Sequence, residues 1–281
     1  MKKFLNIICL VSILCLTAYA PQVWSIEKKP VLSKGTPLVF TTFLNYKPFG
    51  AKGNSSNDIT TVFQPFVDGL SQKYMLRQGF DAQGTYDSLI FKVVEGEIDV
   101  ILGAYYETNK YNGIKLIYPA LLTNPLVLVT MPGNSLQIKT KSDLKKLKGA
   151  IDSREYFSDF VVNELQEYNL QSFDDSEKLY EQLFVGNIDY ILTSRYYGAL
   201  EQAKLGIRKL VVMSKNALWD MPLFIGTSAL TPKGKKIAKT IQDYLKTDKD
   251  SIQKQIEQAL INQIYEADQK AIGLVPPAFV K

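Results

Sequence analysis

Residues 85–129 read TYDSLIFKVVEGEIDVILGAYYETNKYNGIKLIYPALLTNPLVLV, and this stretch decides the fold. Four apolar residues between 89 and 94 recur at helical spacing. Gly96 ends the predicted helix, because glycine readily adopts a positive φ. The apolar run Ile98–Leu102 is too short for a second helix and predicts a buried strand. A polar loop follows at Glu107–Gly113, and a further apolar strand is predicted at Leu126–Met131.

The first half of this pattern returns later in the chain. Residues 176–192 read SEKLYEQLFVGNIDYIL. Their Gly-x-Ile-Asp motif at 186–189 matches the motif at 96–99, and Leu179 matches Leu89. A repeated order of helix, glycine and strand predicts two similarly built α/β lobes with a cleft between them.

The first 25 residues are typical of an export signal. Lys2 and Lys3 precede the apolar run Phe4–Thr17, which is too short to span a bilayer comfortably. Cleavage is expected after residues 18–20 (Ala-Tyr-Ala), with residues 23–25 (Val-Trp-Ser) as the second possibility. An uncleaved N-terminal anchor is the alternative. We therefore expect a periplasmic protein, secreted through its signal peptide.

Composition excludes several classes of protein. The 281 residues are 46% hydrophobic and 22% charged, which is typical of a globular protein long enough for two domains. There is no histidine, and both cysteines, Cys9 and Cys15, lie in the signal. Ser-His and Cys-His catalysis and thiolate zinc sites are thereby excluded, and we expect no cofactor and no metal. The net charge of +5 is too small and dispersed to favour nucleic acid.

Hydrophobic periodicity predicts the remaining elements. Strands are expected at Pro37–Leu44, near Phe80, at Ala150–Ile151, at Ile207–Met213 and at Leu223–Thr227. Helices are expected at Ile59–Tyr74, after a cap at Thr140 or Ser142, at Ser158–Tyr168 and over the tail beyond Ile237. Pro65 requires a kink or a later start in the first of these helices.

Several motifs share their order with one family. They are the export signal, the loop Tyr46-Lys47-Pro48-Phe49, the two Gly-x-Ile-Asp units and the stretch Asp143–Gly149. Together they resemble the extracellular solute-binding proteins of ABC importers, most closely the polar amino acid-binding family (family 3). The resemblance implies an α/β, two-lobe type II periplasmic-binding-protein fold with two crossover hinge strands. Lobe one would comprise residues 26–121 and 219–281, and lobe two residues 122–218.

The same resemblance implies the partners and the mode of action. A small-molecule solute would bind between the lobes, and the closed protein would dock on the membrane permease of an ABC transporter. We expect a monomer that binds no nucleic acid.

The sequence departs from the amino acid receptors at two positions. Where the family has an arginine that grips the ligand carboxylate, this chain has Lys110, or Asn109 if the loop is shifted by one residue. Where the family has an aspartate that pairs the ligand ammonium, this chain has Ser194. A zwitterion enclosed without these partners would leave charge poorly compensated. We infer that the solute is not a standard α-amino acid.

Aromatic and polar residues on the predicted cleft loops are the candidate binding residues. The aromatic candidates are Phe43, Tyr46, Phe49, Tyr105, Tyr156 and Tyr196, with Tyr106 and Tyr197 beside them. The polar candidates are Thr108, Asn109, Lys110, Ser153, Arg154 and Ser194. Arg154, ahead of a predicted helix, is the alternative contact for an anion.

Two other functions compete with solute capture for transport. Some proteins that resemble this family are dehydratases, and Lys110 with Glu107 offers the groups for such an enzyme. A solute sensor without a transport role is the third possibility. We expect binding without catalysis, and no catalytic residues.

Lys110→Ala tests the anion contact. If Lys110 binds an anionic solute, its loss is expected to weaken that solute by about 1–3 kcal/mol, the scale of a charged hydrogen bond. Calorimetric titration measures the change, and an unchanged affinity would remove Lys110 from the site.

Overall fold

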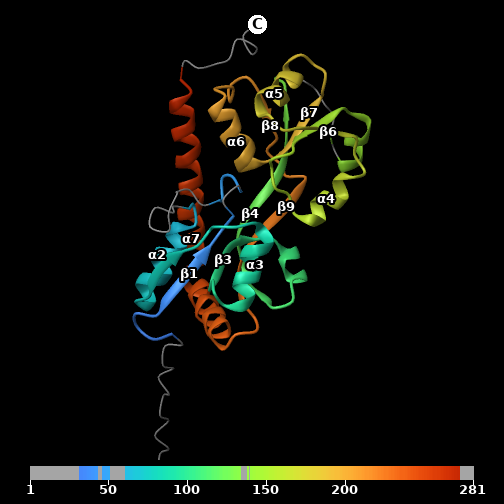
Figure 1. Cartoon of the computed structure of the whole chain (residues 1–281). Helices are drawn as coiled ribbons and strands as arrows, with labels where there is room; N and C mark the ends of the chain where they lie inside the picture. The colour runs from blue at the N-terminus through green and yellow to red at the C-terminus, as the bar shows by residue number, and fades with distance from the viewer. Residues whose placement is uncertain (1–31, 44–45, 51–60, 134–137, 139, 273–281) are drawn as a thin grey trace, which may run out of the picture. The chain divides into compact units, whose positions relative to one another are not determined.

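Two long strands, β4 (Ile114–Thr130) and β9 (Trp219–Ser228), form the centre of one mixed sheet (Figure 1). They pair antiparallel over most of their length. The computed structural model describes residues 32–43, 46–50, 61–133, 138 and 140–272, apart from the side chain of Asn109, so the predicted signal at 1–25 lies outside the described residues. The order of the sheet is β2-β1-β3-β9-β4-β7-β5-β6, with β8 (Val212–Met213) on the end of β4.

The first half of the sheet lies on the β9 side. Its strands are β1 (Pro37–Thr41), β2 (Arg77–Phe80) and β3 (Val100–Ala104), and its helices are α2 (Gln64–Tyr74) and α3 (Tyr86–Glu95). β1 runs parallel to both of its neighbours. Pro65 stands at the first turn of α2, where its missing N–H costs nothing, so the helix starts later than Ile59.

The second half lies on the β4 side and repeats this plan. Its strands are β5 (Gly149–Asp152), β6 (Leu170–Phe173) and β7 (Tyr190–Ser194). Its helices are α4 (Asp159–Leu165), α5 (Ser176–Phe184) and α6 (Arg195–Lys204), with 3-10 helices η1 (Tyr106–Lys110) and η2 (Lys141–Lys146) elsewhere in the chain. Thr140 caps η2, one of the two predicted caps, and Ser158 caps α4.

The two Gly-x-Ile-Asp motifs have the same structural role, which confirms the predicted repeat. Gly96 and Gly186 follow α3 and α5 with φ of +82° and +77°, as a helix end in the left-handed region requires. Asp99 Oδ2 accepts the backbone N–H of Val39 at 2.9 Å, and Asp189 Oδ2 accepts that of Lys148 at 2.7 Å. Each aspartate therefore ties the strand after its helix to the neighbouring parallel strand.

Four elements differ from the prediction. A strand was predicted only at Leu126–Met131, whereas β4 is continuous from Ile114 to Thr130, and its register against β9 shifts between Ile117 and Leu122. Most of Ile207–Met213 forms turns, with only the last two residues in β8. The periodicity did not predict β6 or α6, and α6 contains Tyr196 and Tyr197, which were expected in a loop.

The tail is helical as predicted, and it forms one helix, α7 (Pro232–Lys270). The predicted apolar stripes at spacing four are buried along it, from Ile237 to Ile264. α7 contacts α2, β4 and β9 and then α6, where Ile264 packs against Leu200 (Figure 1). No helix among residues 32–272, where described, is long and apolar enough to cross a membrane.

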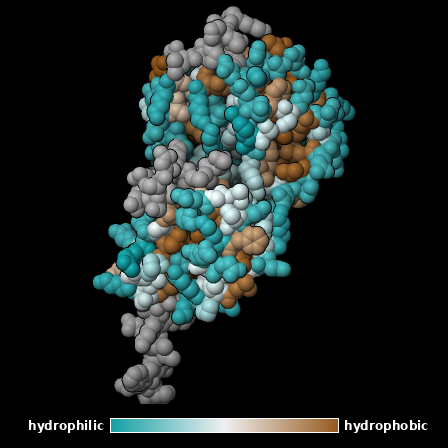
Figure 2. Space-filling model, in the orientation of Figure 1, coloured by the Kyte–Doolittle hydropathy of each residue, from teal (hydrophilic) through white to brown (hydrophobic). Residues whose placement is uncertain are grey.

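The face in Figure 2 is mostly polar, with smaller hydrophobic areas between the charged side chains. The predicted α/β fold with two strands crossing between similar halves is confirmed. All described residues belong to one compact unit of the chain, and the lobe boundaries at 121/122 and 218/219 stay a prediction.

Removing the carboxylate of either motif tests the role of the repeat. Asp99 is 3% exposed and also pairs with Lys233, so Asp99→Ala is expected to lower the free energy of unfolding by about 1–3 kcal/mol. Asp189→Ala is expected to cost less, because its carboxylate is partly exposed. Urea unfolding measures both, with the exposed neighbour Glu97→Ala as a control that changes little. Equal losses in Asp99→Ala and Glu97→Ala would contradict this role.

Candidate functional site

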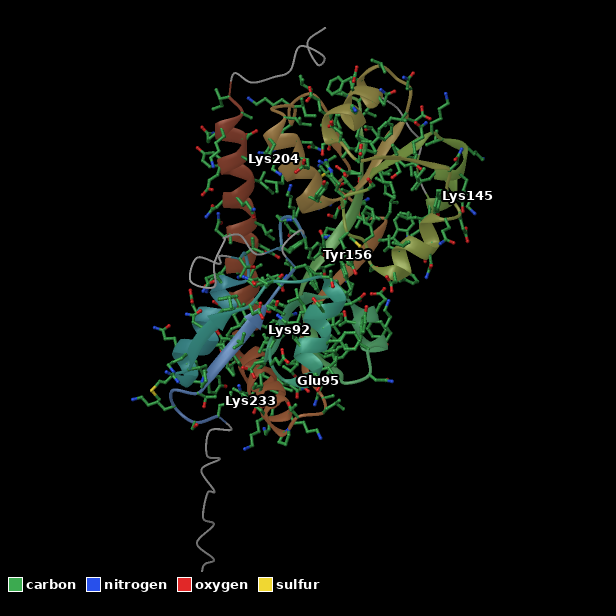
Figure 3. The ribbon with its side chains drawn as sticks, in the orientation of Figure 1. Lys92, Glu95, Lys145, Tyr156, Lys204 and Lys233 are labelled. Atoms are coloured by element: carbon green, nitrogen blue, oxygen red, sulfur yellow. The ribbon has the colours of Figure 1, made fainter. Side chains whose placement is uncertain are left out.

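Aromatic rings from the first half of the chain meet the ring of Tyr156, which follows β5. Figure 3 labels Tyr156. Tyr156 stacks on Tyr105 with ring centroids 5.6 Å apart and an interplanar angle of 12°. Tyr86 lies 5.7 Å away at 28°, and Phe43 lies 6.4 Å away at 25°. Tyr46 meets Tyr156 edge-on at 5.7 Å. We call these five residues the Tyr156 cluster, and three of its rings lie roughly parallel to that of Tyr156, as stacked aromatic rings do.

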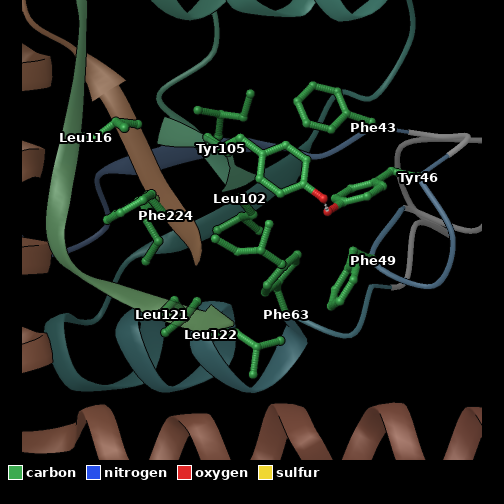
Figure 4. Packing of buried hydrophobic residues seen from close by; sticks show 14 of the residues in the cluster. Phe43, Tyr46, Phe49, Phe63, Leu102, Tyr105, Leu116, Leu121, Leu122 and Phe224 are labelled. Atoms are coloured by element: carbon green, nitrogen blue, oxygen red, sulfur yellow. Dashed lines mark hydrogen bonds between the residues drawn. The ribbon is translucent and has the colours of Figure 1, made fainter. Parts of the chain in front are cut away.

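The hydroxyls of this cluster are hydrogen-bonded to one another. Figure 4 shows the Tyr46 hydroxyl pointing at the Tyr105 hydroxyl, to which it donates a hydrogen bond. The Tyr105 hydroxyl in turn donates to the backbone carbonyl of Tyr156 at 3.4 Å. The Tyr86 hydroxyl and Thr108 Oγ1 are 2.7 Å apart. The first half of the chain thus holds Tyr156 by both stacking and hydrogen bonding.

Asn124 of β4 lies beside the same hydroxyls. Its side chain is 1% exposed. Burial raises the pKa of Tyr46 and Tyr105, and hydrogen bonding to the neighbouring Asn124 amide lowers both pKa values in opposition to burial. The amide therefore lies within hydrogen-bonding reach of the two hydroxyls.

Glu155 is a buried carboxylate immediately before Tyr156. Its Oε1 accepts the backbone N–H of Ser194 at 2.7 Å, and its Oε2 accepts Thr193 Oγ1 at 2.7 Å. Burial, aided by the negative charge of Asp152, raises the pKa of Glu155 to about 8, although the hydrogen bonds from Ser194 and Thr193 act in the opposite direction. Near neutral pH this group can therefore exist in either protonation state.

Arg154 is bound by its own half of the protein. Its Nε and Nη2 donate to the two oxygens of the buried Asp152 at 3.0 and 2.6 Å, and Nη2 also donates to Ser176. Tyr197 donates to the same carboxylate at 2.9 Å. A guanidinium held in this way has few donors left for a solute anion.

Two polar contacts join the halves outside the aromatic cluster. Lys110 forms an ion pair with Asp159 at the start of α4, and Glu107 Oε1 accepts the backbone N–H of Phe160 at 2.9 Å. The Lys110 and Asp159 side chains are 56% and 47% exposed, so this pair adds little stability. Burial raises the pKa of Tyr156, and the negative charges of Asp159, Glu107 and Asp87 contribute in the same direction.

The structure brings together only part of the predicted site. Four predicted aromatic residues are in direct contact: Phe43, Tyr46, Tyr105 and Tyr156. The ring of Phe49 lies 5.2 Å from that of Tyr46 and 5.8 Å from that of Tyr196. Thr108 is hydrogen-bonded to Tyr86 of the cluster, and the backbone N–H of Ser194 donates to Glu155, the residue before Tyr156. Ser153 donates to Phe173 of β6, Lys110 is paired with Asp159, and Arg154 is paired with Asp152. The side chain of Asn109 lies outside the described residues.

Three residues of the site were not predicted. They are Tyr86, the first residue of α3; Glu155, between the predicted Arg154 and Tyr156; and Asn124, between two apolar segments of β4. Only Asn124 carried a signal, because an amide between apolar stretches of a strand is unusual if the strand is buried. Within the part of the chain that the structure describes, no group of three or more Cys, Asp or Glu residues is arranged to hold a metal.

The buried Glu155 predicts a pH dependence of stability. Its folded-state pKa of about 8 exceeds the ordinary value of 4.5, so the folded protein keeps a proton that the unfolded chain loses between these values. The free energy of unfolding is therefore expected to fall as the pH rises from about 5 to 8, by an amount on the order of a few kcal/mol.

In Glu155→Gln the free energy of unfolding is expected to stay constant between pH 5 and 8, because glutamine keeps an acceptor for Ser194 and cannot ionise. Denaturant unfolding at several pH values measures it, with the exposed Glu177→Gln as a control that retains the fall. The same slope in Glu155→Gln and in the original chain would contradict the assignment.

Comparison with known proteins agrees with this architecture. Neither a family model nor a curated protein sequence matches the chain. One similar structure is AncCDT-1, an ancestral cationic amino acid solute-binding protein also described as a precursor of cyclohexadienyl dehydratase (18% identity, TM-score 0.60, 80% of this chain and 95% of that chain). Another is the GluR0 ligand-binding core in complex with L-glutamate (13%, 0.57, 81% and 99%).

A third is AbpA, an amino acid ABC transporter substrate-binding protein from Streptococcus pneumoniae, bound to L-arginine (15%, 0.55, 81% and 96%). At such identities the likeness concerns the fold. The chain has the two-lobe type II periplasmic-binding-protein fold that these proteins share.

Proposed function

We propose that this protein captures a small solute at the Tyr156 cluster, between the two halves of its sheet. The proposal rests on which half of the protein each ring belongs to. Tyr156 follows β5 in the second half, whereas its four aromatic neighbours belong to the first half of the chain. A solute between such rings contacts both halves at once. Only contacts made in the closed form can shift the protein towards closure.

The chemistry of the cluster favours a planar solute. Tyr86 and Tyr105 present ring faces, which stack on planar groups and attract cations. The two cations that were candidates for binding an anion, Lys110 and Arg154, are paired with Asp159 and Asp152. A carboxylate would therefore compete with Asp159 or Asp152 for either of these cations. This supports a small polar or aromatic-stackable solute that is not a standard α-amino acid.

We further propose that capture serves transport. The N-terminal sequence has the features of an export signal, and one protein of the same fold, AbpA, is named as an ABC transporter substrate-binding protein. The protein would work in the periplasm as a monomer and deliver its solute to a membrane permease. No chemical change of the solute is part of this proposal.

Two polar contacts between the halves would stabilise the closed form. Lys110–Asp159 and Glu107–Phe160 join the halves, so the free protein already has contacts that favour closure. Tyr156 fills the space between the rings of the first half. A solute that enters there has to displace Tyr156 or stack beside it, and it must gain more contact than Tyr156 loses.

Catalysis in the same place is the second candidate, and one residue favours it. Glu155, with a pKa of about 8, is poised to exchange a proton near neutral pH. The other groups considered for an enzyme are already occupied, because Lys110 pairs with Asp159 and Glu107 accepts from Phe160. Turnover of a small cyclic acid by the purified protein would favour this second function.

A thermal-shift screen tests the proposal directly. Amino acids, organic acids, amines, sugars and aromatic heterocycles are added to the purified protein, and planar compounds are expected to raise its Tm without being consumed. Tyr156→Ala is expected to weaken their binding by about 1–3 kcal/mol, the scale of ring stacking.

Tyr265→Ala is the matched control, because Tyr265 is an exposed tyrosine on α7. Its affinities are expected to equal those of the unchanged protein. If no planar compound raises the Tm, or if Tyr156→Ala binds them equally well, capture at the Tyr156 cluster is wrong.

A further inference from the structure

We propose that Glu155 couples closure of the two halves to the uptake of one proton, so that acidic solution favours the closed form and alkaline solution the open form. The proposal rests on the closing motion of the proposed function, but not on the identity of the solute. It makes the residue before Tyr156 a pH-sensitive switch.

The first observation is a buried acid without a cation. Glu155 is 8% exposed and takes part in no ion pair within the described residues. Arg154, its neighbour in the chain, pairs with Asp152 instead. A carboxylate that is withdrawn from water without a cation tends to bind a proton. Burial accordingly raises the pKa of Glu155 to about 8.

The second observation is the hydrogen bonding around Glu155, which also accommodates the protonated acid. The backbone N–H of Ser194 donates to Oε1 at 2.7 Å. Thr193 Oγ1 lies 2.7 Å from Oε2 and 3.3 Å from the carbonyl of Ser194, and its single proton cannot serve both oxygens fully. A proton on Oε2 would be donated to Thr193 Oγ1, which would then donate to the carbonyl. Each of these protons would have its own acceptor.

The third observation is that the first half of the chain lies against both sides of this acid. On one side, Tyr156 stacks on Tyr105, whose hydroxyl donates to the Tyr156 carbonyl at 3.4 Å. On the other side is the start of α6, where the first-half ring of Phe49 lies 5.8 Å from that of Tyr196. Parting of the halves would remove both covers and let water reach the Glu155 carboxylate.

The groups that face Glu155 keep their own charge near neutral pH. Burial acts to raise the pKa of Asp152, but hydrogen bonds, first of all from Arg154, lower it below its ordinary value. Asp152 therefore stays ionised. The charge of Glu155 also acts on four hydroxyls whose pKa values burial raises, so that they stay neutral: Tyr46, Tyr105, Tyr180 and Tyr197.

The direction of the coupling follows from the two environments of Glu155. In the closed form its pKa is about 8, whereas contact with water would return it towards the ordinary value of 4.5. Between these values the closed form holds a proton that the open form releases. The ratio of closed to open molecules is therefore expected to fall as the pH rises from about 5 to 8, by at most about tenfold per pH unit.

Distances between two spin labels test the coupling without a solute. Outside the predicted signal the chain has no cysteine, so Gln83→Cys and Asp174→Cys provide two specific labels at exposed positions. These residues follow β2 and β6, the edge strands farthest from β4 and β9 in the sheet order. Double electron–electron resonance on the mature chain is expected to show mainly a short distance at pH 6. A longer distance is expected to gain population towards pH 9 and to lose it when pH 6 is restored.

Two variants decide whether Glu155 is the switch. Glu155→Gln cannot ionise, so the short distance is expected to dominate at both pH values. The exposed Glu177→Gln is expected to respond as the unchanged protein does. If Glu155→Gln does not fold, infrared difference spectra of the unchanged protein report the ionisation of a buried carboxyl group. The midpoint of that ionisation is expected to equal the midpoint of opening, and unequal midpoints would overturn the coupling.

Tyr156→Ala separates this coupling from the closing motion itself. It removes the ring at which the halves meet, so it is expected to populate the longer distance already at pH 6. If it does so while the unchanged protein keeps one distance from pH 6 to 9, the coupling is wrong and the motion stands. Equal opening of Glu155→Gln and the unchanged protein has the same meaning. A single distance in both Tyr156→Ala and the unchanged protein removes the motion, and the proposed function fails with it.

Discussion

The antiparallel pairing of β4 with β9 is the constraint on which the rest of the structure depends. These strands pair from Ile114–Ser228 at one end to Leu126–Trp219 at the other, and every other strand of the sheet is reached through one of them. The six β4 residues from Ile117 to Leu122 lie opposite only three on β9, from Ile225 to Leu223, and the β4 segment includes Pro119, which has no N–H to donate. Beyond this irregularity Asn124 lies beside the hydroxyls of Tyr46 and Tyr105.

Burial of polar groups is what distinguishes the site from the ordinary core. Glu155, Asn124 and the hydroxyls of Tyr46 and Tyr105 are all withdrawn from water in one place. Glu155 receives two hydrogen bonds, yet burial still raises its pKa to about 8. Buried polar groups of this kind lower the stability of the fold. Sites where stability is lowered in this way are expected where a protein binds a ligand.

Much of the fold was predictable from the sequence because its signals are local. The glycine at position 96 and the aspartate at 99 fix a helix end and a strand tie, and their recurrence at 186 and 189 disclosed the second half. α6 was not predicted because it begins directly after β7, with no loop and no side-chain cap to mark its start. The continuity of β4 escaped because the Thr-Asn-Pro segment has the composition of a turn.

The site was less predictable than the fold, since it depends on contacts between distant segments. The stacking of Tyr156 joins residues more than fifty positions apart to form one cluster, and no periodicity reports such a pairing. Arg154 and Lys110 illustrate the same limit. Their charge suggested anion binding, whereas their partners, Asp152 and Asp159, became evident only in three dimensions.

The C-terminal helix has a mechanical consequence. With 39 residues α7 is about 58 Å long, and it contacts α2 in the first half and α6 in the second. A continuous helix attached to both halves resists rotation about β4 and β9 unless it bends or one attachment slides. At the α6 attachment Ile264 packs against Leu200 and Ala203, with Tyr196, Ala199 and Ala267 around them. Opening would therefore combine a hinge in the sheet with shear between two helices, and the contact of Ile264 with Leu200 is one that would have to slide.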